Sequence, residues 1–317
     1  MQKQEGTVIA YAQKVLGQVR QVIVGKDKTL LWVLAAILAK GHILLEDILG
    51  VGKTTMALAF SKTLGLTHNR VQFTPDVLPS DVTGYSVLNQ TDGRMVYQPG
   101  AVLCNLFLAD ELNRATSRTQ SALLEAMEKG QVTVDGVSHP IPKPFVVIAT
   151  QNPTGAAGTQ LLPDSQMDRF AVRLSLGYPS VKDEIAMVMS RQGNDLLKTM
   201  TALFDRQALL AVQEEVAKTY ISQELVGYAV ELINGTRNSE LILRGASPRA
   251  TLALIAMAKA LGQLRGRDYV VPRDIQEVFI PTLSHRLLLS AKAEGRGMTV
   301  QQILQEIMAG TPAPKVR

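Results

Sequence analysis

Apolar residues follow two different patterns along the first 180 residues. Short apolar runs bounded by polar or turn-forming residues predict buried strands at 43–45, 71–73, 103–109 and 145–149. Between these runs the apolar residues recur with helical spacing, which predicts helices at 1–20, 27–40, 56–64 and 116–129. Strands that alternate with helices in this way indicate an α/β fold built on a parallel sheet.

Two further segments of this half predict β-hairpins. Residues 131–141 alternate about Asp135-Gly136, which is a strong hairpin signal. Residues 85–102 form an insertion with an expected turn at Asp92-Gly93. This insertion fits either a surface hairpin or an element that faces a pore or a partner.

The pattern changes at Pro179, after which helices follow one another. Ser247-Pro248 is typical of a helix start, with serine as the N-cap and proline at the first position. We therefore expect one domain at 1–178 and a second at 179–317. Within the second domain the helical spacing predicts helices at 181–192, 205–220, 223–235, 248–264, 272–289 and 299–309.

The size and composition are those of a packed globular protein. The 317 residues suggest about two domains, and 46% are hydrophobic while 19% are charged. The longest apolar run, Leu30–Ala39, is too short to span a bilayer, and the N-terminus lacks a hydrophobic signal core. The single cysteine, Cys104, lies in an apolar stretch and has no possible internal disulfide partner. These observations predict a cytoplasmic protein without a membrane span.

Charge and histidine content exclude little by themselves. The net charge of +5 permits contact with nucleic acid, but the basic residues are scattered and aromatic residues are only 5%. Nucleic acid is therefore not the expected partner. His139 has no second histidine or cysteine close by, so we interpret it as structural or exposed rather than as a metal ligand.

The strongest chemical signal is the stretch ILLEDILGVGKTT at residues 43–55. An apolar strand, a glycine-containing loop, Lys53-Thr54 and a helix make the layout of a phosphate-binding P-loop. Glycines let the backbone direct N–H groups at phosphates, and the helix start favours anions. Lys53 can reach the outer phosphates and Thr54 can hold Mg²⁺. Asp47 stands where the motif has glycine and Leu49 where proline is common; the Asp47 charge near phosphates could weaken binding.

Two adjacent carboxylates, Asp110-Glu111, end the apolar run 103–109. Carboxylates at the end of a buried strand need cationic partners, and in a P-loop protein Mg²⁺ is the expected one. Asp110 would help to hold the ion, and Glu111 would take a proton from attacking water. Asn152 follows the next apolar run, where an amide could orient that water or sense the γ-phosphate.

Two arginines further along the chain are candidates for contact with phosphate. Arg169 lies in LLPDSQMDRF at 161–170 and either forms a surface salt bridge or reaches the ATP of a neighbouring subunit. Arg249 lies in the first turn of a predicted helix, where its charge opposes the helix dipole. We interpret this as a sign of an anionic partner, such as a nucleotide at the domain cleft.

Taken in this order, the motifs resemble those of the MoxR family of AAA+ ATPases over nearly the whole chain. The long block at 119–153 is far more specific than an isolated P-loop. The segments that carry the resemblance are VIVGK (22–26), GVGKTT (50–55), FTPDVLPSDVTG (73–84), ADELNRA (109–115), TQSALLEAMEKGQVTVDGVSHPIPKPFVVIATQNP (119–153), LPDSQMDRF (162–170), GASPRA (245–250) and YVVPRDI (269–275).

The resemblance implies a P-loop AAA+ core, a parallel sheet with helices on both faces, followed by a C-terminal all-α lid domain. It also implies that 85–102 is the helix-2 insert and 131–141 the pre-sensor-1 hairpin. The implied roles are adenine contact for Val24 and Gly25, Walker A for Gly50, Val51, Gly52, Lys53, Thr54 and Thr55, Walker B for Asp110 and Glu111, sensor 1 for Asn152, arginine finger for Arg169 and sensor 2 for Arg249.

The function implied by the resemblance is hydrolysis of ATP with Mg²⁺ at the subunit interfaces of a ring, usually a hexamer. Such proteins act as chaperone-like factors that remodel or mature other proteins, often with a partner that carries a von Willebrand factor A domain. Two alternatives remain open from the residues. One is a nucleic-acid or metal-chelatase motor subunit of the same AAA+ branch. The other is a nucleotide switch that hardly hydrolyses, for which Asp47 is the only support.

Overall fold

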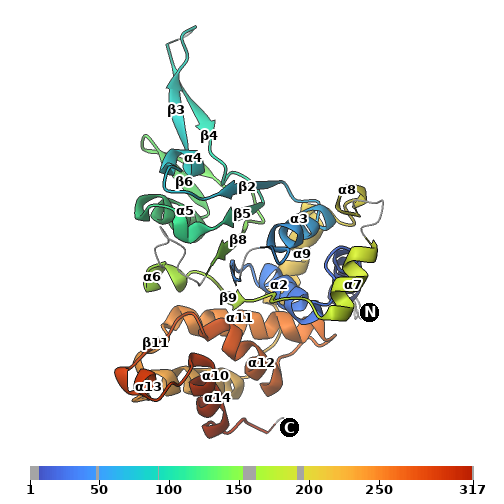
Figure 1. Ribbon diagram of the computed structural model, residues 1–317, viewed down its shortest axis with the longest axis vertical. Helices are drawn as coiled ribbons and strands as arrows, with labels where there is room; N and C mark the ends of the chain where they lie inside the picture. Colours follow the sequence, from blue (N-terminus) through green and yellow to red (C-terminus); the bar gives the residue numbers. More distant parts are fainter. Residues whose placement is uncertain (1–6, 48–49, 92, 153–161, 191–195, 316–317) are drawn as a thin grey trace.

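A five-stranded parallel sheet forms the centre of the computed structural model, with the strand order β2-β5-β8-β1-β9 (Figure 1). The structure describes residues 7–47, 50–91, 93–152, 162–190 and 196–315, so Leu49 and Asp92 of the predictions above lie outside it. The parallel sheet predicted from the apolar runs is confirmed. Its strands are β1 (Ile43–Glu46), β2 (His68–Gln72), β5 (Leu106–Asp110), β8 (Val146–Gln151) and β9 (Val172–Leu174).

Alternate residues of the inner strands face two separate hydrophobic cores. In β5, Leu106 and Leu108 belong to one core, and Phe107 and Ala109 belong to the other. Helices α1, α2 and α3 cover the first face, and α4 and α5 cover the second. The predicted layers of helices on both faces are therefore confirmed. The helices of this part are α1 (Thr7–Arg20), α2 (Asp27–Leu38), α3 (Lys53–Thr63), α4 (Pro79–Thr83), η1 (Leu112–Arg114), α5 (Ser117–Lys129) and α6 (Asp164–Met167).

Both predicted hairpins are present, and they touch each other. The insertion contains β3 (Gly84–Leu88) paired with β4 (Met95–Pro99), and it projects from the core at the top of Figure 1. The second hairpin contains β6 (Gln131–Val134) and β7 (Val137–Pro140). The ring of His139 stacks on Tyr97 at a centroid distance of 3.7 Å. His139 therefore helps to join the hairpins.

The C-terminal half is a helical lid, as predicted, but it also contains one short antiparallel pair. Strands β10 (Ile242–Arg244) and β11 (Leu288–Leu289) pair where the spacing predicted no strand. The helices are α7 (Val181–Ser190), α8 (Leu196–Thr199), α9 (Arg206–Ala217), α10 (Gln223–Asn238), α11 (Pro248–Leu264), α12 (Pro272–Leu283), α13 (Ala291–Gly295) and α14 (Val300–Gly310).

Two features of this half differ from the expected pattern. The helix expected at 272–289 ends at Leu283, because the chain turns through Ser284–Arg286 and then enters β11. Helix α9 packs on α1 and α2 as well as on α11, and Gln213 Nε2 donates to the Ile37 carbonyl at 2.7 Å. The helices that follow residue 179 therefore divide between the lid and the sheet-bearing part.

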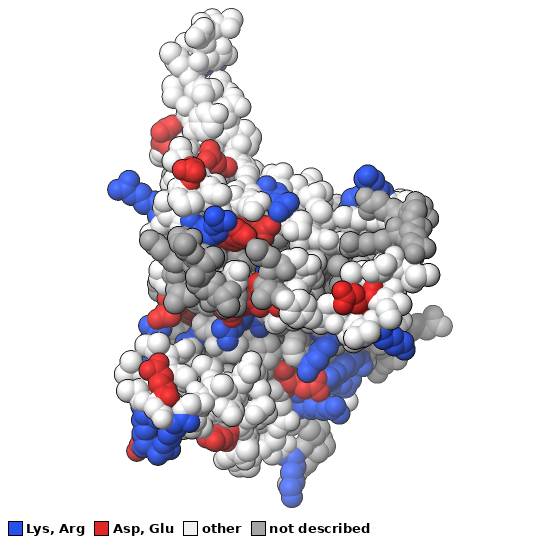
Figure 2. Space-filling model, viewed as in Figure 1, with Lys and Arg blue, Asp and Glu red and all other residues white. Residues whose placement is uncertain are grey.

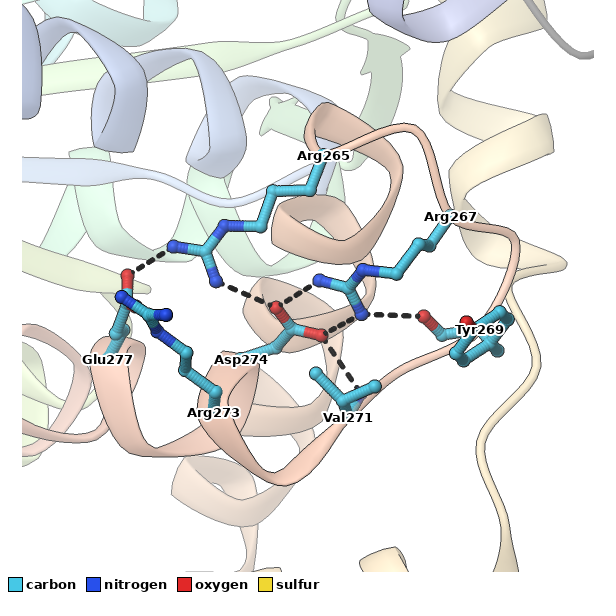
Figure 3. A network of polar contacts seen from close by, with 7 residues as sticks. All are labelled: Arg265, Arg267, Tyr269, Val271, Arg273, Asp274 and Glu277. Carbon is cyan, nitrogen blue, oxygen red and sulfur yellow. Dashed lines mark hydrogen bonds and ion pairs between the residues drawn. The ribbon is translucent and has the colours of Figure 1, made fainter. Parts of the chain in front are cut away.

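A buried aspartate holds the lid together between α11 and α12 (Figure 3). Asp274 is inaccessible to solvent, and its carboxylate accepts hydrogen bonds from Arg265, from both terminal nitrogens of Arg267 and from the Val271 N–H. Four donors satisfy both oxygens, which offsets the cost of burying the charge. The end of α11 is thereby fixed to the start of α12.

Two further properties concern the described residues. None of the described helices is both long enough and apolar enough to cross a lipid bilayer. Cys104 is buried beside β5, and burial raises the pKa of its thiol to about 11.

Candidate functional site

The loop after β1 has the geometry that phosphate binding requires. Gly50 and Gly52 adopt φ angles of 84° and 93°, a region that side-chain-bearing residues rarely occupy. Gly52 precedes the first residue of α3, which is Lys53. The first N–H groups of a helix have no intrahelical partner, so an anion would be stabilised at this helix start. The predicted P-loop residues Val51, Thr54 and Thr55 surround Lys53 and are all partly exposed.

Lys53 lies close to Asp110, the predicted magnesium ligand, and to Glu111, the predicted base. Its side chain is buried, and its Nζ donates to the Asp47 carbonyl at 2.8 Å. Burial lowers the pKa of Lys53, while the charges of Asp47, Asp110 and Glu111 act in the opposite direction. Strands β1 and β5 end at the same edge of the parallel sheet, which explains why these groups meet.

Thr150, which the sequence reasoning did not single out, connects the two carboxylate residues. Its hydroxyl donates to Asp110 Oδ1 at 2.6 Å and accepts the Glu111 N–H at 2.9 Å. Thr150 lies near the end of β8, between β1 and β5. Asn152 is the first residue after β8, and its carbonyl accepts a hydrogen bond of 3.4 Å from Asn113. The predicted residues Asp110, Glu111 and Asn152 are thus gathered at one edge of the sheet.

Each carboxylate of the pair also has an arginine partner. Arg70 from β2 pairs with Asp110 at 2.8 Å, and Arg114 from η1 pairs with Glu111 at 2.7 Å. Glu111 itself has a left-handed backbone, with φ 55° and ψ 44°. A non-glycine residue in this conformation is uncommon, and such residues cluster at functional sites. A single arginine, whether on a strand like Arg70 or in a short helical turn like Arg114, carries no distinguishing sequence signal, and neither partner is predicted from the sequence.

The side chains at this edge suit a hydrated magnesium ion. The hydroxyl of Thr54, in the first turn of α3, and the carboxylate of Asp110 are hard oxygen donors of the kind that Mg²⁺ prefers. Mg²⁺ is commonly bound by one or two such protein ligands together with phosphate oxygens. The residues present therefore fit the predicted magnesium site.

The segment predicted to contact adenine lies beside the P-loop. A Cβ atom placed on Gly52 would lie 4.0 Å from Cδ1 of Ile23. Val24 is half-buried and Gly25 is exposed, with a φ of 73°. Lys26 Nζ donates to the Tyr178 carbonyl at 2.7 Å, so residues 178–183 border the same segment. The adenine contact predicted for Val24 and Gly25 stays a prediction, but the segment adjoins the P-loop as that role requires.

The side chain of Asp47 contacts the chain after β9. Its carboxylate accepts hydrogen bonds from Ser175 Oγ at 2.7 Å, the Leu176 N–H at 2.5 Å and the Gly177 N–H at 3.0 Å. The carboxylate is thus turned toward residues 175–177, whose three donors stabilise its charge. Whether this charge weakens phosphate binding stays a prediction. The motif glycine is replaced here by a residue that ties the loop to residues 175–177.

Arg169 and Arg249 lie together, but apart from the P-loop. Both pair with the same carboxylate, that of Glu128 near the end of α5: Arg169 with Oε2, and Arg249 with Oε1 at 2.5 Å. Arg169 also donates to the Leu124 carbonyl at 2.8 Å. Their charges lower the pKa of the Glu128 carboxyl, mainly through the hydrogen bond from Arg249.

The direction of the chain places this arginine pair at the opposite edge of the sheet. Helix α5 returns from the carboxyl end of β5 toward the amino end of β8, over 13 residues or about 20 Å. Met127 on its last turn lies within 3.3 Å of His42, which directly precedes β1. Arg169 precedes β9, so it too lies at the amino edge. One chain therefore does not bring Arg249 to its own P-loop.

Comparisons with known proteins agree with this architecture. The family described as the ATPase family associated with various cellular activities (AAA) matches residues 42–172, and an AAA lid domain family matches residues 234–307. The uncharacterized protein YeaC of Bacillus subtilis is 42% identical over 304 residues, which cover 96% of this chain and 95% of that protein.

A second relative and a solved structure extend the likeness to nearly the whole chain. Chaperone MoxR1 of Mycobacterium tuberculosis is 36% identical over 318 residues, covering 96% of this chain and 82% of that protein. A crystal structure of a proposed ATPase from Cytophaga hutchinsonii superposes with a TM-score of 0.90 at 36% identity, covering 98% of both chains.

Proposed function

Because the chain belongs to the MoxR family of AAA+ ATPases, we propose that it hydrolyses ATP at the interface between two copies of itself. The observation that carries this proposal is the separation of two groups of residues. Lys53, Asp110 and Glu111 lie at the carboxyl edge of the sheet, and the Arg169–Arg249 pair lies at the amino edge. Arginines so placed can complete only the site of another chain.

Each residue at the carboxyl edge has a defined task in this proposal. The N–H groups of Gly50–Thr54 and the Lys53 ammonium bind the phosphates, while Val24 and Gly25 border the base. Thr54 and Asp110 would hold Mg²⁺, which when bound neutralises charge on the phosphates. Glu111 accepts a proton from the attacking water, and Asn152 orients that water.

The arginine pair of the neighbouring chain supplies the remaining charge. Arg169 stabilises the negative charge on the transferring phosphoryl group, and Arg249 binds the same phosphates beside it. An interface that joins opposite edges of two identical chains is heterologous, and it closes into a ring when the rotation allows. We propose a hexamer, which is the usual assembly in this family.

A mixing experiment tests the shared site. Lys53→Ala removes the nucleotide site of a chain, and Arg169→Ala removes its finger, so each variant alone should lose about a thousandfold or more of the turnover. Mixed in equal amounts, they should recover about a quarter of the wild-type rate, since half of the intact sites meet an intact finger. Arg169→Ala should still bind a fluorescent ATP analogue. No recovery in rings of normal size would contradict the proposal.

We further propose that hydrolysis drives the remodelling of another protein. The β3–β4 hairpin stands clear of the core, and most of its atoms on the face in Figure 2 are uncharged. Leu88 and Met95 are paired near its tip and are each 61% exposed. Apolar side chains on such a projection suit contact with a client protein or with a partner that carries a von Willebrand factor A domain.

The client can be captured with a trapped variant. Glu111→Gln removes the base, so the chain should hold ATP and retain bound proteins from native lysate. Recovery of a von Willebrand A-type protein together with a further protein would support remodelling. The same capture with Leu88→Ser and Met95→Ser added should fail if the hairpin is the contact. Recovery of nuclease-sensitive nucleic acid, or of a chelatase complex, would favour the motor alternative instead.

A further inference from the structure

The backbone that carries Arg169 is held by the lid of its own chain. Arg286 follows α12, and its side chain is 2% exposed. Its guanidinium donates to the Phe170 carbonyl at 2.7 Å and the Asp168 carbonyl at 3.1 Å, and its Nε lies 2.9 Å from the Asp168 carboxylate. One lid side chain therefore contacts the residues on both sides of Arg169.

Two other lid residues reach the same segment. Nε2 of His285 lies 2.9 Å from the Phe170 carbonyl. The hydroxyl of Ser247 donates to Asp168 Oδ2 at 2.8 Å and also accepts the Ala250 N–H at the start of α11. Asp168 thus joins the turn after α12 to the helix start that carries Arg249. Both arginines are attached to one junction, centred on the partly exposed Asp168 and the buried Arg286.

The same lid turn is also linked to the strand that precedes the P-loop. Arg173 of β9 donates to the Ser284 carbonyl at 3.1 Å, and its other terminal nitrogen pairs with Glu46 at 2.8 Å. Glu46 is the last residue of β1 and adjoins Asp47. A displacement of the lid that starts at the nucleotide side can therefore be transmitted to the segment around Arg169.

We propose that Arg286 is the positioning residue of the trans-acting arginine pair: it fixes the segment that carries Arg169 to the lid, which itself carries Arg249, so that the lid of one chain sets the position of both arginines at the ATP of the next. This inference rests on the proposed function, because it presumes that the pair acts on a neighbouring chain. The guanidinium suits the task, since its planar set of donors satisfies several carbonyl groups and a carboxylate at once. A lysine ammonium in that place cannot reproduce the geometry.

The mixing experiment above tests the proposal when Arg286→Lys is placed in one chain at a time. In the Lys53→Ala chain, which donates the finger, Arg286→Lys should reduce the recovered turnover about tenfold to a hundredfold. In the Arg169→Ala chain, which supplies only the nucleotide site, it should change the recovered turnover by less than about twofold. A purely structural role of Arg286 would reduce recovery in both arrangements alike.

Two further variants protect this test against general damage to the lid. Arg267→Lys alters another lid arginine bound to a buried aspartate, with no contact to residues 168–171 among the interactions described, and should act equally in either chain. Ser247→Ala is a milder change at the junction and should again act only in the finger-donating chain. Equal losses for Arg286→Lys in both chains, or none in either, would overturn the inference. If the mixture of Lys53→Ala and Arg169→Ala chains without any further change recovers no turnover, the result contradicts the proposed function itself and not only the role of Arg286.

Discussion

The carboxylate of Asp47 fixes the position of the P-loop relative to the start of the lid connection. It is 5% exposed, and its three donors come from Ser175, Leu176 and Gly177. Its own carbonyl accepts the Lys53 ammonium. The alternative of a weakly hydrolysing switch has only Asp47 in its favour, and these contacts give Asp47 a structural role as well.

Asp47→Gly should therefore lower the stability of the folded protein and should not raise its ATPase turnover. Two backbone N–H groups and one hydroxyl would lose their acceptor in a buried place, which should lower the free energy of unfolding by about 2–4 kcal/mol. Turnover should fall, because the P-loop loses its anchor. Urea unfolding and steady-state ATPase assays measure both effects. Asp135→Gly, at an exposed turn with φ 50°, should leave stability unchanged or slightly higher. A many-fold rise in turnover for Asp47→Gly would favour the switch after all.

His42 should make the protein sensitive to acid. Its Nδ1 accepts the Val147 N–H at 3.0 Å, so protonation would place a second hydrogen against that donor. Burial lowers its pKa from 6.5 to about 4. As the pH falls, His42 is protonated in the unfolded chain before it is protonated in the folded chain. The contribution of neutral His42 to the free energy of unfolding is therefore complete above pH 6.5 and decreases as the pH drops toward 4. The expected slope is about 1.4 kcal/mol per pH unit.

His42→Asn provides the control for this pH dependence, because its amide oxygen can still accept the Val147 N–H without titrating. Its unfolding free energy should have a shallower slope than that of the wild type between pH 6.5 and 4. Identical slopes would show that His42 does not contribute.

Sequence alone could predict the candidate site residues but not all of their partners. Lys53, Asp110 and Glu111 stand in local motifs, so their types and spacing carry the signal. Arg70 meets Asp110 only through the pairing of β2 with β5, which no local pattern encodes. Arg114 is only three residues from Glu111, but their contact depends on the turn that begins at Glu111. The role of Asp47 depends on residues 128 or more positions away.

At the scale of elements, the long periodic segments were predicted well and the lid connections were not. Helix α12 ends six residues before the predicted end at 289, because His285 and Arg286 turn inward to the Phe170 carbonyl. Such polar residues in a helical pattern look like solvated positions until their tertiary partners are known. The domain boundary at 178–179 stays a prediction, since α9 packs on α1 and α2.

The junction of α11 with α12 should depend on a single charge. Asp274→Asn would leave two arginines without a buried anion and would place an amide N–H₂ group where only acceptors fit. We expect the free energy of unfolding to fall by about 2–4 kcal/mol, as measured by denaturant titration. Glu277→Gln, at a partly exposed neighbour in the same network, should cost less than about 1 kcal/mol. Equal costs for the two variants would contradict the central role of Asp274.

At the scale of the whole molecule, one chain carries its two groups of candidate site residues at opposite edges of one sheet, and in the proposed function each group is half of a site. Glu128 pairs with both arginines within the chain, so they have an anionic partner apart from any neighbour. The carboxyl and amino edges of the sheet are separated because of the directions in which the strands and α5 run. The separation of the two groups is therefore a property of the fold topology and not of any single residue.

The turnover per chain should therefore rise with protein concentration. Dilution separates the chains by mass action and leaves each nucleotide site without its arginines. ATPase rates measured across a dilution series should fall together with the assembled mass from light scattering. Arg169→Ala should show a rate near zero throughout while assembling over the same range. A constant rate per chain in fully dissociated samples would mean that the site is complete within one chain.

The burial of the single cysteine has a practical consequence for optical experiments. At neutral pH a thiol with a pKa of about 11 is almost entirely protonated, and Cys104 is also shielded by the core around β5. Maleimide dyes should therefore react very slowly with Cys104 and label an introduced surface cysteine selectively. One fluorophore on the lid and another on the β3–β4 hairpin would then report lid motion in a working assembly, without a cysteine-free background having to be engineered.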